Sequence, residues 1–142
     1  MAVAVVDTGV LIGRADTDDR HHRTATEIVR GIDHGELPTG RVLDPVILET
    51  LNWIHERTRH ETAIETYSRL NRSAGFEIVQ TARKDFRRAV ELFEQYDQLA
   101  FGDAMIAAYM DREGIEYCYS FDDDFDGLQW ITRLETPENP FT

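Results

Sequence analysis

The sequence predicts an α/β fold, a sandwich of helices around a mostly parallel central sheet of about five short strands. The run Ala2–Val6 is continuously apolar, rich in valine and short, which is typical of a parallel strand buried on both faces. Further strand-like runs follow, separated by segments with helical spacing. Because 142 residues with 42% hydrophobic content can bury the core of one domain, residues 1–142 are assigned to a single domain.

Two helices are expected after the first strand. Thr8–Arg14 has the composition of a short helix. Asp18 or Asp19 can cap the next helix, because an aspartate side chain accepts hydrogen bonds from the free N–H groups of a first helical turn. This second helix is expected to end at about His34, before Gly35.

A second strand and two more helices fill the middle of the chain. Val42–Leu43 is expected to be a short strand. Asp44-Pro45 is a favourable pair for the N-cap and first position of a helix, and apolar residues then recur at helical spacing to about Arg57. Glu49 therefore lies on a helix. The following helix is expected from about Glu61 to Gly75.

The last part of the chain repeats the alternation of strand and helix. Phe76–Val79 is the expected third strand, and Thr81 can cap a helix that runs to about Tyr96. Gly102–Arg112 is a helix whose alanines permit close packing, and Gly114 ends it. The two remaining expected strands are Tyr117–Phe121 and Trp130–Leu134.

The charge of the chain is strongly negative and almost free of lysine. The formal net charge is −12, and 14 of the 15 basic residues are arginines, Lys84 being the single lysine. Acidic surfaces of this kind suit concentrated salt, where carboxylates hold water and their repulsion is screened within about 3 Å at 1 M. We therefore expect a halophilic protein. Proteins that bind nucleic acid usually have a basic surface, so the negative charge argues against a nucleic-acid partner. This argument weakens in high salt, where long-range repulsion is screened and short-range contacts dominate.

The composition also bears on compartment and redox chemistry. The apolar runs are far shorter than the roughly 20 residues that span a bilayer, so no membrane association is expected. No basic segment with a cleavage site precedes the first strand, and a cytoplasmic location is the expectation. Cys118 is the single cysteine and is expected to be a buried, inert thiol.

Four acidic residues stand where solvation alone does not explain them. Asp7 and Asp122 end two strands, Asp103 opens a helix, and Glu49 interrupts an apolar helix face. Strand ends meet at the carboxyl edge of a parallel sheet, so the aspartates form a crevice if their strands are neighbours. Clustered carboxylates become favourable when they bind divalent cations, and Mg²⁺ or Mn²⁺ prefers such oxygen ligands. One or two ions would support hydrolysis of a phosphodiester bond.

Four fragments together resemble the PIN domain, and in particular the VapC-like ribonuclease toxins of toxin–antitoxin pairs. They are Val5-Val6-Asp7-Thr8, Leu48-Glu49-Thr50-Leu51, Phe101-Gly102-Asp103-Ala104-Met105-Ile106-Ala107-Ala108 and Ser120-Phe121-Asp122-Asp123-Asp124-Phe125. The resemblance runs nearly end to end and implies the three-layer α/β/α PIN fold.

The resemblance also implies functional residues and partners. Asp7, Glu49, Asp103 and Asp122 match the family's catalytic and metal-binding quartet, Asp124 an additional acidic ligand, and Thr8 a hydroxylated residue beside the metal. The family further implies Mg²⁺ or Mn²⁺, endonucleolytic cleavage of RNA, a homodimer, and neutralisation by a small VapB-like antitoxin protein. The acidic surface is a departure that leaves the path of the RNA open.

Alternatives remain at this stage. A PIN-domain enzyme of RNA processing or quality control, without an antitoxin, would share the same site motifs. A receiver-like signalling module also clusters carboxylates around Mg²⁺, but it needs a lysine at a strand end, and Lys84 is expected to open a helix. Arginines of the second half, Arg69 and Arg72 among them, could contact phosphates, although we expect an exposed face of salt bridges.

Overall fold

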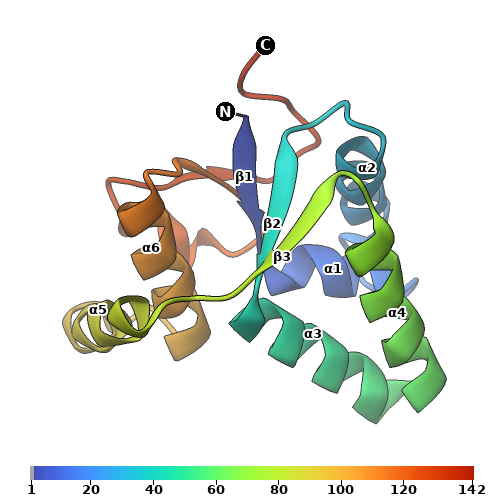
Figure 1. The fold of residues 1–142 in the computed structure, drawn as a ribbon, viewed down its shortest axis with the longest axis horizontal. Helices are drawn as coiled ribbons and strands as arrows, with labels where there is room; N and C mark the ends of the chain where they lie inside the picture. Colours follow the sequence, from blue (N-terminus) through green and yellow to red (C-terminus); the bar gives the residue numbers. More distant parts are fainter. Residues whose placement is uncertain (1) are drawn as a thin grey trace.

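The computed structural model describes residues 2–142, and its centre is the apolar strand β1 (Val3–Val6), all four residues of which are buried. Strands pair with both edges of β1, and helices cover both faces of the sheet around it (Figure 1). The sheet has the order β3-β2-β1-β4-β5 and every pairing is parallel. The remaining strands are β2 (Thr39–Leu43), β3 (Phe76–Val79), β4 (Tyr117–Tyr119) and β5 (Thr132–Leu134).

Six helices flank the sheet, which confirms the predicted α/β/α sandwich. Figure 1 shows α5 and α6 on one side of the sheet, with α1, α2 and α4 on the other. The helices are α1 (Thr8–Ala15), α2 (His22–Asp33), α3 (Asp44–Arg57), α4 (His60–Arg72), α5 (Arg83–Gln95) and α6 (Phe101–Glu113). No helix within residues 2–142 combines the length and apolar character that crossing a bilayer requires.

The strand order places a crevice beside β1. The chain moves outward from β1 to β2 and β3, then returns to pair β4 with the free edge of β1, where Val6 lies opposite Tyr119. In parallel α/β sheets, ligands bind outside the carboxyl ends of the strands at the point where the order reverses. The ends of β1 and β4 form that point here. The two strands are neighbours, which is the condition under which Asp7 and Asp122 were expected to meet.

The predicted caps of α3 and α5 are wrong, because the two capping residues bond to each other instead. Leu43 is the N-cap of α3, and the Asp44 carboxylate accepts hydrogen bonds from the backbone N–H of Thr81 at 2.8 Å and from its hydroxyl at 3.0 Å. Ala82 takes the N-cap position of α5, where its N–H donates to Asp85 at 2.7 Å. The Asp44–Thr81 pair thus ties the loop after β3 to the start of α3.

Other boundaries differ by a few residues. Neither Asp18 nor Asp19 is the N-cap of α2, which begins only at His22; the Asp19 carboxylate accepts from the backbone N–H of His21 in the preceding turn. Strand β4 ends at Tyr119 rather than Phe121, and the acidic loop after it contains a short 3-10 helix, η1 (Asp123–Gly127).

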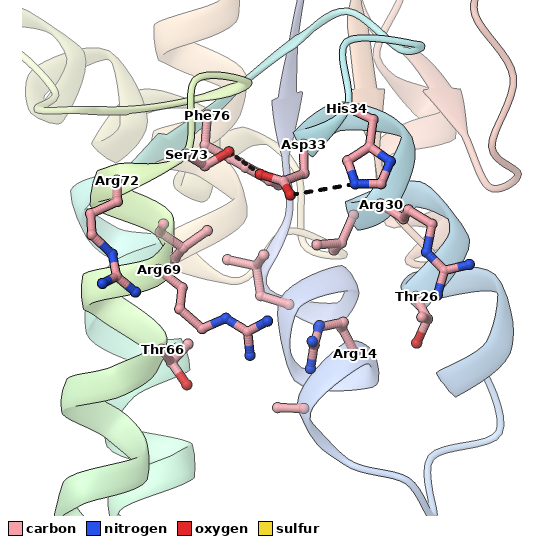
Figure 2. A pocket seen from close by; sticks show the side chains of 14 residues that line it. Arg14, Thr26, Arg30, Asp33, His34, Thr66, Arg69, Arg72, Ser73 and Phe76 are labelled. Carbon is pink, nitrogen blue, oxygen red and sulfur yellow. Dashed lines mark hydrogen bonds and ion pairs between the residues drawn. The ribbon is translucent and has the colours of Figure 1, made fainter.

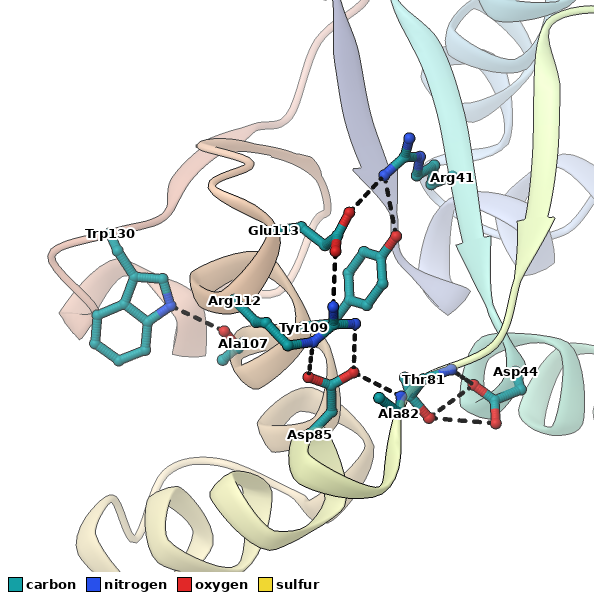
Figure 3. Close-up of polar contacts among 10 residues, drawn as sticks. All are labelled: Arg41, Asp44, Thr81, Ala82, Asp85, Ala107, Tyr109, Arg112, Glu113 and Trp130. Carbon is teal, nitrogen blue, oxygen red and sulfur yellow. Dashed lines mark hydrogen bonds and ion pairs between the residues drawn. The ribbon is translucent and has the colours of Figure 1, made fainter.

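Helix α6 is the most deeply buried helix of the site, and charged residues anchor its far end. Its residues Ala104–Met110 are all buried, and Gly114 ends the helix with a left-handed φ of 68°. Figure 3 shows Arg112 of α6 gripping Asp85 of α5 through two hydrogen bonds, of 2.6 and 2.9 Å. Burial opposes ionisation of Asp85, but the bonds from Arg112 and Ala82 prevail and hold its pKa below the ordinary value. The α5–α6 pair is therefore locked by a bidentate ion pair.

Candidate metal centre

Two carboxylates meet at the crevice because their strands are neighbours. Asp7 follows β1 and caps α1, its Oδ1 accepting from the backbone N–H of Thr8 at 2.8 Å. Asp122 follows β4 and caps η1, its Oδ1 accepting from the N–H of Asp124 at 2.9 Å. Each carboxylate is thereby oriented by the backbone of the element that it begins.

A third carboxylate comes from α6. Asp103 lies in the first turn of this helix, and carboxylate oxygens of Asp7, Asp103 and Asp122 all lie within 4.8 Å of one another. Asp7 is only 6% exposed, while the other two are half-buried. Segments nearly the whole chain apart therefore converge on one small acidic cluster, open to solvent on one side.

Burial and mutual repulsion raise the pKa values in the cluster. Burial raises the pKa of Asp7, against hydrogen bonds from Ser120 and Thr8 that lower it. The pKa of Asp103 rises to about 8. Burial is the largest cause, followed by repulsion from Asp7 and from Asp122, and a hydrogen bond between Asp103 and Asp122 adds to the rise. Without a counterion, the cluster holds its negative charge at a cost, which is what a cation site requires.

Glu49 lies at the border of this cluster. It projects from the exposed side of α3, and its pKa is raised by burial and then by repulsion from Asp7. Gly102 makes room for it, since a Cβ at position 102 would come within 2.5 Å of Glu49 Oε1. Glu49 is not among the three residues whose oxygens converge within 4.8 Å, but it faces them from α3.

Asp124 and Thr8 occupy different places around the centre. Asp124 belongs to a second acidic group with Asp122 and Asp123, again with oxygens within 4.8 Å, so Asp122 is shared between the two groups. Asp123, the third member of this second group, is exposed. Thr8 is buried beside Asp7 at the start of α1.

The sequence reasoning assigned no role to Ser120, which joins the two strand-end aspartates. Ser120 is fully buried, and its hydroxyl donates to Asp7 Oδ2 at 2.7 Å. Ser120 Oγ in turn accepts a hydrogen bond from the backbone N–H of Asp122 at 3.0 Å. The available signal was a small hydroxylated residue in an otherwise apolar strand end. Ser120 fixes the orientation of Asp7 and lowers its pKa relative to burial alone.

The donor set fits a hard divalent cation. It consists of carboxylate oxygens on a half-open surface, which leaves room for water, and Mg²⁺ and Mn²⁺ favour such a combination. Cys118 lies nearby on β4, but it is completely buried and burial raises the pKa of its thiol, as expected for an inert cysteine. A soft, thiolate-binding metal is therefore a poor match.

A family model of the PIN domain matches residues 4–131. The chain belongs to the PIN domain family. No curated protein sequence matches it closely enough to add to this assignment. The acidic cluster thus lies in a PIN domain, which excludes the receiver-like signalling module. That module also needs a lysine at a strand end, whereas Lys84 lies in the first turn of α5.

Solved structures share this PIN fold. VapC20 of Mycobacterium tuberculosis, described as a sarcin-ricin loop cleaving toxin, is 22% identical with a TM-score of 0.76, over 92% of this chain and 97% of that one. VapBC2 of Rickettsia felis, bound to a promoter DNA fragment, is 12% identical with a TM-score of 0.70, over 93% of this chain and 97% of that one. A toxin–antitoxin complex of Klebsiella pneumoniae is 20% identical with a TM-score of 0.66, over 96% of this chain and 98% of that one. At these identities the likeness establishes the fold.

Proposed function

We propose that this PIN domain is a metal-dependent endoribonuclease that hydrolyses RNA phosphodiester bonds as the toxin of a toxin–antitoxin pair. The observation that carries the proposal is the convergence of Asp7, Asp103 and Asp122 within 4.8 Å at the carboxyl ends of β1 and β4. Membership of the PIN family supports the same reading. Neither a nucleophilic serine nor a catalytic thiol is needed for this chemistry.

Each acidic residue has a defined part in the proposed site. Asp7, Asp103 and Asp122 would hold one or two Mg²⁺ or Mn²⁺ ions, with Glu49 and Asp124 as further acidic ligands. When bound, the metal would activate a water and neutralise charge on the leaving oxygen. Ser120 and Thr8 hold the Asp7 carboxylate in a fixed orientation, and Thr8 flanks it from α1.

The proposal that this protein is a toxin rests on the solved structures that share its fold. VapC20 is described as a toxin, and the Rickettsia and Klebsiella structures contain toxin–antitoxin complexes. These relatives favour a cytoplasmic toxin bound by a small VapB-like antitoxin over an RNA-processing enzyme without one. Expression of the active enzyme without its antitoxin should arrest growth, whereas an active enzyme that leaves growth unaffected would favour the processing role.

A homodimer is part of the same proposal, and α5 offers a surface for it. Phe86, Val90 and Phe93 recur at helical spacing and are 53%, 37% and 47% exposed. Such a stripe of large apolar side chains is typical of an interface. Sedimentation should show a dimer that Phe86→Ser and Phe93→Ser together convert to a monomer, whereas Ile64→Ser, on the exposed face of α4, leaves it unchanged. A monomeric wild type would contradict the dimer.

The central test is cleavage of total cellular RNA with and without divalent metal. We expect cleavage in Mg²⁺ or Mn²⁺, none in EDTA, and none by Asp7→Asn or Asp103→Asn, because each change removes ligand charge. Asp97→Asn is the matched control, since Asp97 is exposed and belongs to neither acidic group. Folded Asp103→Asn protein with full activity would refute the site.

A further inference from the structure

Two aromatic rings stack beside the acidic centre. The rings of His21 and Phe121 lie face to face, with centroids 4.1 Å apart and an angle of 9° between their planes. Phe121 stands directly before Asp122 in the chain. Its ring also lies next to Gly9 of α1, where a Cβ would meet Phe121 Cδ2 at 4.0 Å. The stack therefore adjoins Asp122 in sequence and contacts the first turn of the helix that Asp7 begins.

Hydrogen bonds hold His21 in this position. Its backbone N–H donates to the Asp19 carboxylate at 2.8 Å, and its ring Nε2 accepts from Arg20 Nε at 3.1 Å. The next residue, His22, donates from Nδ1 to the carbonyl oxygen of Gly13 at 2.8 Å, which ties the start of α2 to the last turn of α1. A ring that is already fixed loses little conformational freedom when a ligand stacks on it.

Both rings reach the solvent. His21 and Phe121 are half-buried, and Gly9 beside them is exposed and has no side chain that could cover the stack. Within residues 2–142, His21 makes no ring contact other than the one with Phe121. Neither ring lines the groove between α1, α2 and α4 that Figure 2 shows. One face of the His21 ring is thus without an aromatic neighbour and can receive a flat ligand.

The flat ligand that fits this place is a nucleobase. A phosphodiester bond at the acidic centre has a base attached to the nucleotide on either side of it. Every base presents a π-face, and aromatic side chains, histidine included, stack on the bases of single-stranded RNA. Stacking also suits a chain of net charge −12, because it does not depend on attraction between the protein and phosphates. The base must be unpaired, since a base inside a duplex already stacks on its neighbours.

We propose that the ring pair of His21 and Phe121 binds an unpaired nucleobase of the RNA next to the scissile phosphate, with the base stacked on the free face of His21. The inference rests on the proposed ribonuclease function and adds a base-binding site to it. It gives the enzyme a preference for single-stranded RNA. The stack also supplies affinity that persists in concentrated salt, where phosphate contacts weaken.

The test compares RNA decamers with and without bases. Uridine, adenosine and abasic decamers carry the same phosphates, so their dissociation constants differ mainly through contacts to the bases. Binding is measured by fluorescence anisotropy in EDTA across a KCl series, so cleavage plays no part. We expect wild type to bind the better of the two RNAs roughly 5- to 100-fold more tightly than the abasic decamer, as one base–aromatic stack provides. This ratio should change little with KCl, because the phosphate contacts are the same.

Three variants separate stacking from folding. His21→Ala should lose most of the preference for bases, whereas His21→Phe keeps a ring on Phe121 and should retain the preference. His60→Ala is the matched control and should behave as wild type, because His60 belongs to the other ring contact of a histidine, with His55, and both are exposed. If His21→Ala does not fold, His21→Leu fills the same space without an aromatic ring and gives the same comparison.

The outcomes distinguish a base site from a packing contact. A wild type that binds neither RNA better than the abasic decamer overturns the inference. So does a His21→Ala protein that keeps the wild-type preference or binds all three decamers more weakly by the same factor. In Mg²⁺, His21→Ala should raise KM for RNA and leave kcat unchanged, as for loss of uniform binding. Absence of wild-type cleavage instead contradicts the ribonuclease function, whereas the preference for bases in EDTA still tests the base site.

Discussion

Asp103→Asn should stabilise the metal-free protein while it abolishes cleavage. Burial and the neighbouring carboxylates raise the pKa of Asp103 from 3.8 to about 8 in the folded state. A raised carboxyl pKa means that the unfolded chain releases this proton at lower pH than the folded protein does. Stability from this group is therefore fully present below about pH 4 and declines until the pH passes about 8. Asparagine cannot ionise and escapes this decline.

The size of the effect follows from the two pKa values. At about 1.4 kcal/mol for each pH unit between 3.8 and about 8, the ceiling is about 6 kcal/mol. Since the side chain is half-buried and water screens part of the repulsion, we expect about 2 kcal/mol at pH 8. For a domain of this size that corresponds to a rise in Tm of roughly 4 to 8 °C.

The assay is thermal and urea unfolding of wild type and Asp103→Asn in EDTA, between pH 4.5 and 8.5. The variant should gain stability over wild type as the pH rises, and the two should converge at the acid end. Asp97→Asn removes an exposed carboxylate outside the cluster and should show no such divergence. An Asp103→Asn protein less stable than wild type at pH 8 in EDTA would refute the argument from repulsion.

Three further predictions concern the same centre and the surface. Millimolar Mg²⁺ or Mn²⁺ should raise the Tm of wild type more than that of Asp103→Asn, because the cation binds only the folded cluster; equal shifts in calorimetry would count against the site. Gly102→Ala should reduce kcat with little change in Mg²⁺-free stability, since its Cβ would displace Glu49 Oε1, whereas Gly114→Ala should reduce stability through its φ of 68°. Lowering KCl from about 1 M to about 0.1 M, which lengthens screening from roughly 3 to roughly 10 Å, should destabilise the fold, as circular dichroism can measure. A protein equally stable at both salt concentrations would contradict the halophilic interpretation.

Much of the fold could be predicted because local and global preferences agree there. Val3–Val6 reads as a buried strand in isolation and is one, and Gly114 ends α6 with the φ that glycine tolerates. The caps of α3 and α5 failed because Asp44 and Thr81 satisfy each other across 37 positions. A capping preference measures only the local choice, and a long-range partner can outweigh it.

The site could be predicted in part for the same reason. Asp7 and Asp122 were placed at strand ends from pattern alone, but their meeting depended on β1 pairing with β4, which pattern does not determine. The surroundings of Arg69 and Arg72 could not be predicted. They were expected on an exposed face of salt bridges, but neither forms an ion pair within residues 2–142. Whether Arg69 of α4 pairs with a glutamate on its own helix or lies near Arg14 of α1 (Figure 2) depends on how the helices pack, and the sequence holds no local record of this.

The carboxylates of the centre are not equivalent, and their surroundings explain the difference. Asp7 accepts one hydrogen bond on each oxygen, from Thr8 and from Ser120, and each oxygen keeps a second lone pair that can face the cluster. These donors favour the charged form and set the orientation of Asp7 before any cation arrives. Asp103 instead shares its hydrogen bond with the carboxylate of Asp122, so the proton that relieves repulsion resides there. An arriving cation must displace that proton, whereas the bonds from Thr8 and Ser120 already hold the Asp7 carboxylate in a fixed orientation. For this reason Asp103→Asn tests repulsion cleanly, while Asp7→Asn would also break the contacts that join β1 to β4.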